Sequence, residues 1–219
     1  TMKDLFPIPQ DKFKVHSGGR SPVVATYDYQ DEKGNLLFQV CRTADKRFFQ
    51  RRPNGQGGWT NSLGGMKPVL YKLPEMLQAI KRGDVVFIPE GEKDCDNLAG
   101  LGFTATTSPM GAGKWRSYYS DWLKGAEAVI LPDNDEPGHK HAQQVAKSLY
   151  GKAASVKILE LPGLQDKGDD VTDWVNDGGT KEELLQLVQE APEWEPEPEG
   201  SSDDGEKITQ ADKLIQIAV

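Results

Sequence analysis

The chain of 219 residues is long enough for one domain plus a smaller one, and its 37% hydrophobic and 27% charged residues are ordinary for a globular protein. The sequence has no apolar stretch long enough to cross a membrane and no basic-then-apolar leader, so we expect a cytoplasmic protein with no membrane partner. Cys41 and Cys95 have no ligand-spaced neighbours, and the sequence therefore supports neither a zinc finger nor a disulfide framework.

The net charge of −8 is distributed unevenly along the chain. Residues 1–85 hold 14 basic and 8 acidic residues, residues 86–189 hold 10 and 17, and residues 190–206 hold 8 acidic residues and no basic ones. A basic front end suits contact with phosphates, and an acidic middle suits metal binding. A merely solvated surface would explain the basic front end equally well.

Residues 1–82 are predicted to form a small, basic, β-rich N-terminal subdomain. Three strands with β-branched and aromatic residues are expected there, over residues 23–29, 36–42 and 48–52. The run 53–65 is rich in Gly and Asn and is predicted to be a loop. Residues 73–81 have the apolar spacing of a short helix.

Apolar strands alternate with helices in residues 83–190. Strands are predicted over residues 85–88, 103–107, 128–131 and 155–161. Helices are predicted over residues 93–100, 115–123, 138–150, 171–175 and 181–189. This alternation is typical of an α/β fold with a four-stranded parallel sheet flanked by helices. In such sheets the functional groups gather at the carboxyl ends of the strands.

The C-terminal part of the chain has a different composition. Residues 191–206 are rich in Pro, Glu and Ser and are predicted to be an acidic disordered linker. Residues 207–219 begin a helical pattern, which we interpret as the start of a truncated helix leading to a further domain; a simple tail is the alternative.

Acidic residues directly follow three of the four predicted strands. Glu90 follows the first strand, Asp133 and Asp135 follow the third, and residues 169–173 contain three aspartates after the fourth. Because parallel strands place these ends on one edge of a sheet, we expect the carboxylates to converge. Neighbouring carboxylates repel one another unless a cation neutralises them, and oxygen ligands favour Mg²⁺ or Mn²⁺. Taken singly, each group could instead be a surface turn or a helix cap.

The segment SPMGAGKW at residues 108–115 superficially resembles a P-loop. That motif does not fit, because its first glycine is replaced by Ser and its lysine is followed by Trp rather than by Ser or Thr. A strand-to-helix loop beside the acidic residues fits better, with the amides around Gly111 and Gly113 and the side chain of Lys114 contacting a phosphate. A tight turn without a ligand is the alternative.

Basic and aromatic side chains alternate at the third predicted strand. Arg47, Arg51 and Arg52 flank Phe48 and Phe49, a mixture typical of single-stranded nucleic-acid binding. An edge strand protected by its charges would have the same composition.

The residues HKH at positions 139–141 lie at the start of the long predicted helix, beside the acidic residues. Histidines two apart face different sides of a helix, so these two cannot both ligate one ion. We expect at least one of them to be solvated, and Lys140 to point towards a phosphate.

Four motifs, in the order EGEKD, SPMGAGKW, DNDEPGHKHA and LPGLQDKGDDVTDW, resemble the Toprim domain. The resemblance covers residues 83–190 well and extends weakly through residues 20–82. It is strongest to the primase part of phage and plasmid primase–helicase proteins. It implies a Toprim-like parallel sheet behind a basic N-terminal subdomain.

The resemblance also implies roles for the acidic residues. Glu90 would act as general base or acid, and Asp133 and Asp135 would be catalytic and hold the metal with it. Asp94 matches a second acidic residue of the first motif and would be a further ligand. Asp170 best matches the third acidic motif.

The third acidic motif departs from the family pattern. The family often has two aspartates one residue apart there, whereas this chain has Asp170 and Asp173 three apart. Asp169 and Asp173 therefore remain competitors of Asp170 for the role of third ligand.

By this resemblance the chain is a DNA primase fragment that makes RNA primers with Mg²⁺ or Mn²⁺. Its partners would be a single-stranded DNA template, nucleoside triphosphates and a helicase domain downstream in the parent chain. A metal-dependent Toprim nuclease is one alternative, and it would degrade DNA without nucleoside triphosphates. A non-catalytic module that binds nucleic acid or loads a helicase is another, and its template binding would survive the loss of Glu90.

Overall fold

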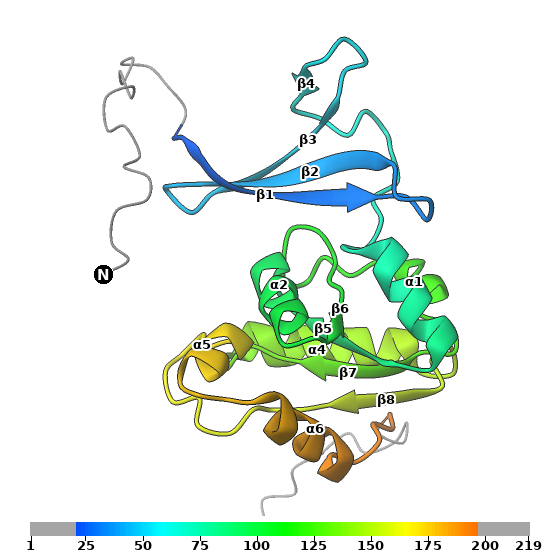
Figure 1. The fold of residues 1–219 in the computed structure, drawn as a ribbon, viewed down its shortest axis with the longest axis vertical. Coiled ribbons are helices and arrows are strands. Elements are labelled where there is room, and N and C mark those ends of the chain that lie inside the picture. The colour runs from blue at the N-terminus through cyan, green and yellow to red at the C-terminus, as the bar shows by residue number, and fades with distance from the viewer. Residues whose placement is uncertain (1–20, 197–219) are drawn as a thin grey trace, which may run out of the picture.

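The computed structural model describes residues 21–196, which form an antiparallel sheet and an α/β body beneath it (Figure 1). Residues 1–20 of the expected N-terminal subdomain, residues 197–206 of the expected linker and the expected helix at 207–219 lie outside the described residues.

The antiparallel sheet comes first in the chain. Its strands are β1 (Val23–Gln30), β2 (Leu36–Thr43), β3 (Phe48–Pro53) and β4 (Trp59–Thr60), paired in that order. Tyr27 and Tyr29 of β1 lie opposite Val40 and Phe38 of β2, and all four side chains are buried. Because residues directly opposite each other point to the same side, these four form one apolar face of the sheet.

A parallel sheet with helices forms the α/β body. Its strands are β5 (Val85–Pro89), β6 (Thr104–Ala105), β7 (Glu127–Leu131) and β8 (Ser155–Ile158), in the spatial order β6-β5-β7-β8. Its helices are α1 (Leu73–Arg82), α2 (Glu92–Gly100), α3 (Tyr119–Trp122), α4 (Glu136–Leu149), α5 (Val171–Asn176) and α6 (Lys181–Glu190). Every strand pair in this sheet is parallel, so the strands end at one common edge.

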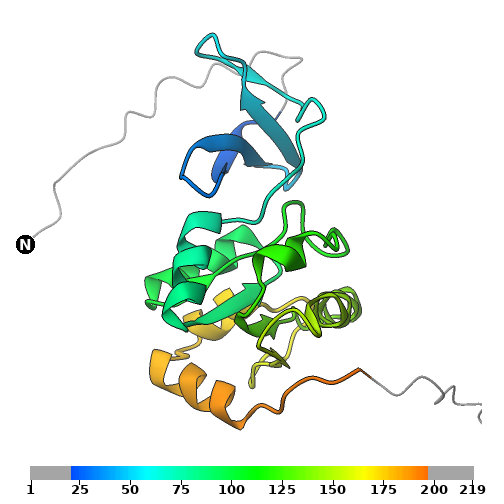
Figure 2. The same ribbon diagram turned by 90° about the vertical axis from the view of Figure 1, so that its right-hand side faces the viewer.

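The helices cover both faces of the parallel sheet (Figure 2). Val86 and Ile88 point to the face covered by α1, α3 and α4, whereas Phe87 and Val129 point to the face covered by α2, α5 and α6. This confirms the predicted fold class: a four-stranded parallel sheet flanked by helices, with an N-terminal β subdomain. Within residues 21–196, every helix is too short or too polar to span a lipid bilayer.

Four expected elements differ from the structure. The strand expected over 155–161 ends at Ile158, the last residue of β8. The helix expected over 115–123 is reduced to α3, and the strand expected over 103–107 is reduced to β6. After β6, the hydroxyls of Thr106 and Thr107 donate to the backbone oxygens of Tyr71 and Glu90. These bonds connect the end of the strand to two other segments of the chain. The loop expected over 53–65 contains β4, which pairs with the end of β3.

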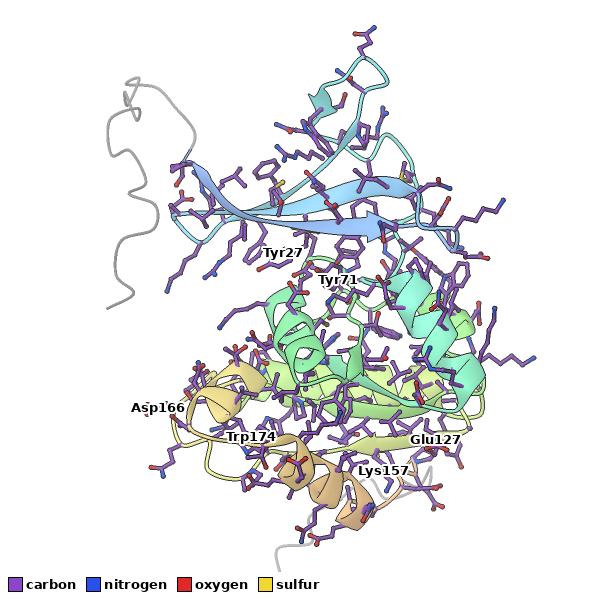
Figure 3. The ribbon with its side chains drawn as sticks, viewed as in Figure 1. Tyr27, Tyr71, Glu127, Lys157, Asp166 and Trp174 are labelled. Carbon is purple, nitrogen blue, oxygen red and sulfur yellow. The ribbon has the colours of Figure 1, made fainter. Side chains whose placement is uncertain are left out.

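Aromatic residues join the antiparallel sheet to the body (Figure 3). The rings of Tyr27 and Tyr71 meet edge to face with centroids 6.0 Å apart, and Tyr29 lies 5.3 Å from the same ring. The buried hydroxyl of Tyr29 donates to Glu92 at the start of α2, over 2.7 Å. Since one apolar core runs through both parts, the antiparallel sheet is fixed over α2.

The first residues after α6 lie against the body. Trp194 donates its backbone N–H to the carbonyl of Val156 in β8, over 2.7 Å. Its indole N–H donates to Gln143 of α4, and its ring meets Tyr150 edge to face. Residues 191–196, the part of the expected linker that the structure describes, therefore run beside the outer strand of the parallel sheet.

Candidate active site

Carboxylates gather where the parallel strands end. We call Glu90, Asp94, Asp133, Asp135 and Asp170 the acidic edge. Glu90 directly follows β5, and Asp133 is two residues past the end of β7. Asp94 is in the first turn of α2, whereas Asp135 and Asp170 are the N-caps of α4 and α5.

Asp133 is the carboxylate most affected by its surroundings. Burial raises its pKa to about 8, and the negative charges of Glu90, Asp94 and Asp170 contribute in the same direction. The backbone also places these segments side by side: Pro89, just before Glu90, pairs with Leu131, two residues before Asp133. The Asn134 N–H donates to the Asp169 carbonyl over 2.8 Å, which ties the third acidic segment to the same edge.

Glu90 shows the same pattern. Burial raises the pKa of Glu90, and the charges of Asp135 and Asp170 raise it further. The opposing influence is a hydrogen bond of 3.2 Å that the Ala112 backbone N–H donates to its Oε1. The catalytic candidate is therefore a half-buried carboxylate among like charges.

Asp94 is almost fully buried, at 5% exposure. Burial raises its pKa to about 6, and the charge of Asp170 adds to this, while a hydrogen bond donated by the Thr172 hydroxyl acts against it. The amide of Asn97 in turn donates to Thr172 over 2.6 Å. Asp94 is thus oriented by the first turn of α5.

Two carboxylates of the edge also cap helices. Asp135 accepts a hydrogen bond of 2.8 Å from the N–H of Gly138, which fixes the start of α4. Asp170 accepts from the N–H of Asp173, and the Asp173 side chain accepts from the N–H of Asp170 in return. Asp169 accepts from two amides of the preceding loop. Among Asp169, Asp170 and Asp173, the three candidates for the third acidic ligand, Asp170 is the one whose charge raises the pKa of the other carboxylates at the edge.

Four of the five carboxylates of the acidic edge accept a hydrogen bond from the protein itself: Glu90, Asp94, Asp135 and Asp170. Within residues 21–196, no three His, Cys, Asp or Glu side chains are close enough together to form a ligand shell for a metal. The chemistry of the donors nevertheless fits a divalent cation, because they are all oxygens and their burial together is unfavourable without a positive charge.

The glycine-rich loop, residues 108–114, borders the acidic edge. Its backbone is left-handed at Met110, Gly111 and Gly113, with φ values of 76°, 76° and 70°. Its Ala112 amide donates to Glu90, and its Gly113 amide donates to Nδ1 of His141 over 3.0 Å. The loop thus turns two successive amides towards side chains at this edge.

Comparison with known proteins places the chain in a phage family. No protein-family model matches it. Gene 57 protein of Mycobacterium phage D29 is 30% identical to it over 128 residues, which are 58% of this chain and 76% of the phage protein. The chain belongs to the family of this phage protein.

Solved structures show that the chain has the fold of a primase catalytic core. The Aquifex aeolicus primase, with its zinc-binding and RNA polymerase domains, matches with a TM-score of 0.60 at 19% identity, over 77% of this chain and 40% of that one. A DnaG catalytic domain bound to single-stranded DNA gives 0.56 at 17%, over 77% and 53%. The primase fragment of the bacteriophage T7 primase–helicase gives 0.51 at 22%, over 74% and 61%. The chain thus spans about half the length of these proteins.

The basic residues in and just before β3 lie apart from one another. Arg51 donates to Gln39 over 2.7 Å and its guanidinium lies 4.3 Å from the ring centre of Trp59, on the side of the sheet away from the body. Arg47 is exposed and forms an ion pair of 2.7 Å with Asp45. Arg52 points to the other side and packs beside Gly64. The structure does not gather these arginines into one site.

Cations do meet in a cavity beside the glycine-rich loop. We call it the basic cavity; it has a volume of about 510 Å³ and lies between residues 63–68 and the loop. Lys67, Lys114 and Arg116 line it, with Met66 and Met110 among the apolar lining residues and no acidic residue in its wall. Lys114 itself belongs to the glycine-rich loop, whose Ala112 amide reaches Glu90, and its contact with a phosphate stays a prediction.

The basic residue expected on α4 is placed differently. Lys140 pairs with Glu136 one turn earlier, over 2.6 Å, and both side chains are exposed. Its interaction lies along the outer surface of α4, where a pair four residues apart is favourable.

Glu92 was not singled out in the sequence, and the burial of His141 was not predicted. Glu92 is 6% exposed and accepts the hydrogen bond of Tyr29, and burial raises its pKa. His141 is 7% exposed, whereas His139 is half-exposed and lies 3.2 Å from Glu160. The spacing of His141 from Val145 and Leu149, four and eight residues, was a usable signal, because it places the imidazole on the apolar stripe of α4.

Proposed function

We propose that this chain is the nucleotidyl-transfer part of a DNA primase, which makes RNA primers on single-stranded DNA from nucleoside triphosphates. The observation that carries the proposal is the acidic edge beside the glycine-rich loop and the basic cavity. One region thus offers oxygen ligands for a cation, and the neighbouring region offers ammonium and guanidinium groups for phosphates.

The acidic edge would hold Mg²⁺ or Mn²⁺ through Asp133 and Asp135, with Glu90, Asp94 and Asp170 as further ligands. A bound cation would lower the pKa of the attacking hydroxyl and offset charge on the phosphate. Mutual repulsion of the metal-free carboxylates supports this assignment, because a cation relieves it.

The reaction would join the primer 3′-hydroxyl to the α-phosphorus of the incoming nucleotide and release pyrophosphate. Glu90 would accept the hydroxyl proton, since its half-buried carboxylate has a raised pKa from burial and is a better base than an exposed one. Lys67, Lys114 and Arg116 would bind triphosphate or template phosphates at the basic cavity.

Two partners, a single-stranded DNA template and a helicase domain, are proposed from the solved structures of similar fold. A primase core with this fold has been solved with single-stranded DNA, and another comes from a primase–helicase. These likenesses support a single-stranded template and a helicase domain in the parent chain of this protein. Arg51 and Trp59 would form a second contact with the template, outside the catalytic edge.

The test is extension of a short RNA primer, already annealed to single-stranded DNA, by labelled nucleoside triphosphates with Mg²⁺ or Mn²⁺. An annealed primer removes the need for initiation. We expect extension by the unaltered chain and none by Asp133→Ala. DNA cleavage without nucleotide incorporation would replace the proposal with a nuclease. Template binding that persists in Glu90→Gln, with no incorporation by either protein, would replace it with a non-catalytic binding module.

A further inference from the structure

Two successive amides of the glycine-rich loop are held by side chains from different parts of the fold. The Ala112 N–H donates to Oε1 of Glu90 over 3.2 Å, and the Gly113 N–H donates to Nδ1 of His141 over 3.0 Å. Glu90 follows β5, whereas His141 is on α4. The position of the loop is thus tied to two elements at once.

His141 is built into the body rather than exposed beside it. It is 7% exposed, and burial lowers its pKa, which favours the neutral ring. A backbone N–H can only donate, so Nδ1 must be the accepting nitrogen and the proton of the neutral ring is on Nε2. His141 and Glu90 also border the same packing gap, too small for a water molecule, together with apolar residues of β5, β7 and α4. The two side chains that hold the loop are therefore neighbours.

The loop depends on such external contacts. Three of its residues are left-handed, and Met110 adopts this conformation, at φ 76°, although it has a side chain. The Ser108 hydroxyl is buried and has no hydrogen-bond partner among the described residues. A segment with these features is not held by regular secondary structure, so bonds to Glu90 and His141 determine where its amides point.

We propose that His141 is a positioning residue that holds the glycine-rich loop against Glu90. By accepting from Gly113 it keeps the adjacent Ala112 amide within reach of Glu90, and this amide orients the carboxylate. The catalytic consequence rests on the proposed function, whereas the hold on the loop does not.

The chain offers a matched control on the same helix. Gln144, three residues after His141, donates to the carbonyl of Trp115 over 3.3 Å, just past the loop. Gln144→Leu therefore removes a hydrogen bond between α4 and the same stretch of chain without touching the Gly113 amide. His141→Leu fills the buried space but cannot accept a hydrogen bond, and His141→Asn keeps an acceptor close to the position of Nδ1.

The experiment measures amide hydrogen exchange at Ala112 and Gly113 by NMR in the full chain, and primer extension with the same proteins. In His141→Leu we expect exchange at both amides to speed up by about tenfold, the size of effect that one lost hydrogen bond produces. We expect kcat to fall by about tenfold with the template KM unchanged, because Glu90 is misoriented while the basic cavity is intact. His141→Asn should restore most of both, and Gln144→Leu should alter neither.

Unchanged Gly113 exchange in His141→Leu would overturn the proposal. So would equal losses of kcat in His141→Leu and Gln144→Leu, which would reduce His141 to ordinary packing. If the unaltered chain extends no primer, the proposed function fails, and the exchange rates still decide whether His141 holds the loop.

Discussion

The acidic edge and the antiparallel sheet carry opposite charges, and they differ in whether those charges have partners within the protein. In the sheet, Arg47 is paired with Asp45, and Arg51 donates to Gln39, whose amide donates in turn to Asp28, so each guanidinium already has an acceptor within the protein. At the acidic edge, like charges lie together and raise the pKa of Asp133. A folded chain keeps such repulsion only where a ligand relieves it, so uncompensated charge marks the functional region more clearly than charge itself.

The largest expected effect tests whether that repulsion serves function. Asp133→Asn replaces a carboxyl whose ionised form is unfavourable in the metal-free protein with a neutral amide of nearly the same shape. We expect calorimetry to show Mn²⁺ affinity reduced by about a hundredfold, as expected for the loss of a metal ligand. In metal-free buffer near neutral pH we expect the free energy of unfolding to rise by about 1 kcal/mol, because the carboxyl must take up a proton on folding and the amide does not.

Urea unfolding with a chelator measures the second quantity. Glu136→Gln is the matched control, since Glu136 lies three residues further along but is exposed and paired with Lys140. A loss of stability in metal-free Asp133→Asn would show that the acidic edge is balanced without a cation, and the contrast with the antiparallel sheet would disappear.

A close backbone contact provides the next prediction. A Cβ added at Gly138 would lie 2.6 Å from the backbone oxygen of Asp133 and 3.0 Å from its nitrogen. Gly138→Ala must therefore push α4 away from the acidic edge, and we expect a loss of about 2–3 kcal/mol in the free energy of unfolding. Gly100→Ala, at the end of α2, is the control: its Cβ meets nothing within 4 Å, so we expect no loss. Similar unfolding midpoints for the two variants would contradict the close contact.

The sequence was sufficient to predict the acidic edge in outline, for a physical reason. Strands β5 and β7 are continuous apolar runs, which is typical of buried parallel strands, and such strands end at one edge. Glu90 and Asp133 could thus be placed together without any knowledge of tertiary contacts. The short strand β6 could not be bounded, because the residues that follow it make side-chain bonds to distant segments.

Contacts between segments that are distant in the sequence could not be predicted from strand patterns or composition. The bond between Tyr29 and Glu92 joins residues 63 positions apart, and no periodicity in either segment indicates it. Composition suggested nucleic-acid binding by Arg47, Arg51 and Arg52, with a charge-protected edge strand as the alternative, and it could not say which side of the sheet each arginine faces. A strand alternates its sides, however, and Arg51 and Arg52 therefore point in opposite directions.

The contact between the antiparallel sheet and the α/β body gives a prediction of intermediate size. Tyr29→Phe leaves the buried carboxylate of Glu92 without its 2.7 Å partner, and we expect the free energy of unfolding to fall by about 1–2 kcal/mol. Tyr71→Phe removes a comparable bond to Asp96, which is exposed and also paired with Lys72. We therefore expect a smaller loss there. Thermal or urea unfolding of both variants measures the difference, and equal losses would mean that burial at Glu92 does not strengthen the joint.

The smallest expected effect compares two cations directly. Lys114 lines the basic cavity, whereas Arg47 is held by Asp45 on the exposed sheet. Replacing either with Ala should change stability by less than about 0.5 kcal/mol, because both side chains are at the surface.

The two replacements should differ in their effect on the binding of single-stranded DNA. A cation that contacts phosphate releases a counterion, so Lys114→Ala should reduce the slope of log affinity against log salt by about 0.7. Arg47→Ala should leave that slope nearly unchanged, since binding a phosphate would first require breaking its bond to Asp45. Fluorescence anisotropy of a labelled oligonucleotide across a salt series gives both slopes, and a larger change for Arg47 would mean that the template follows the antiparallel sheet rather than the basic cavity.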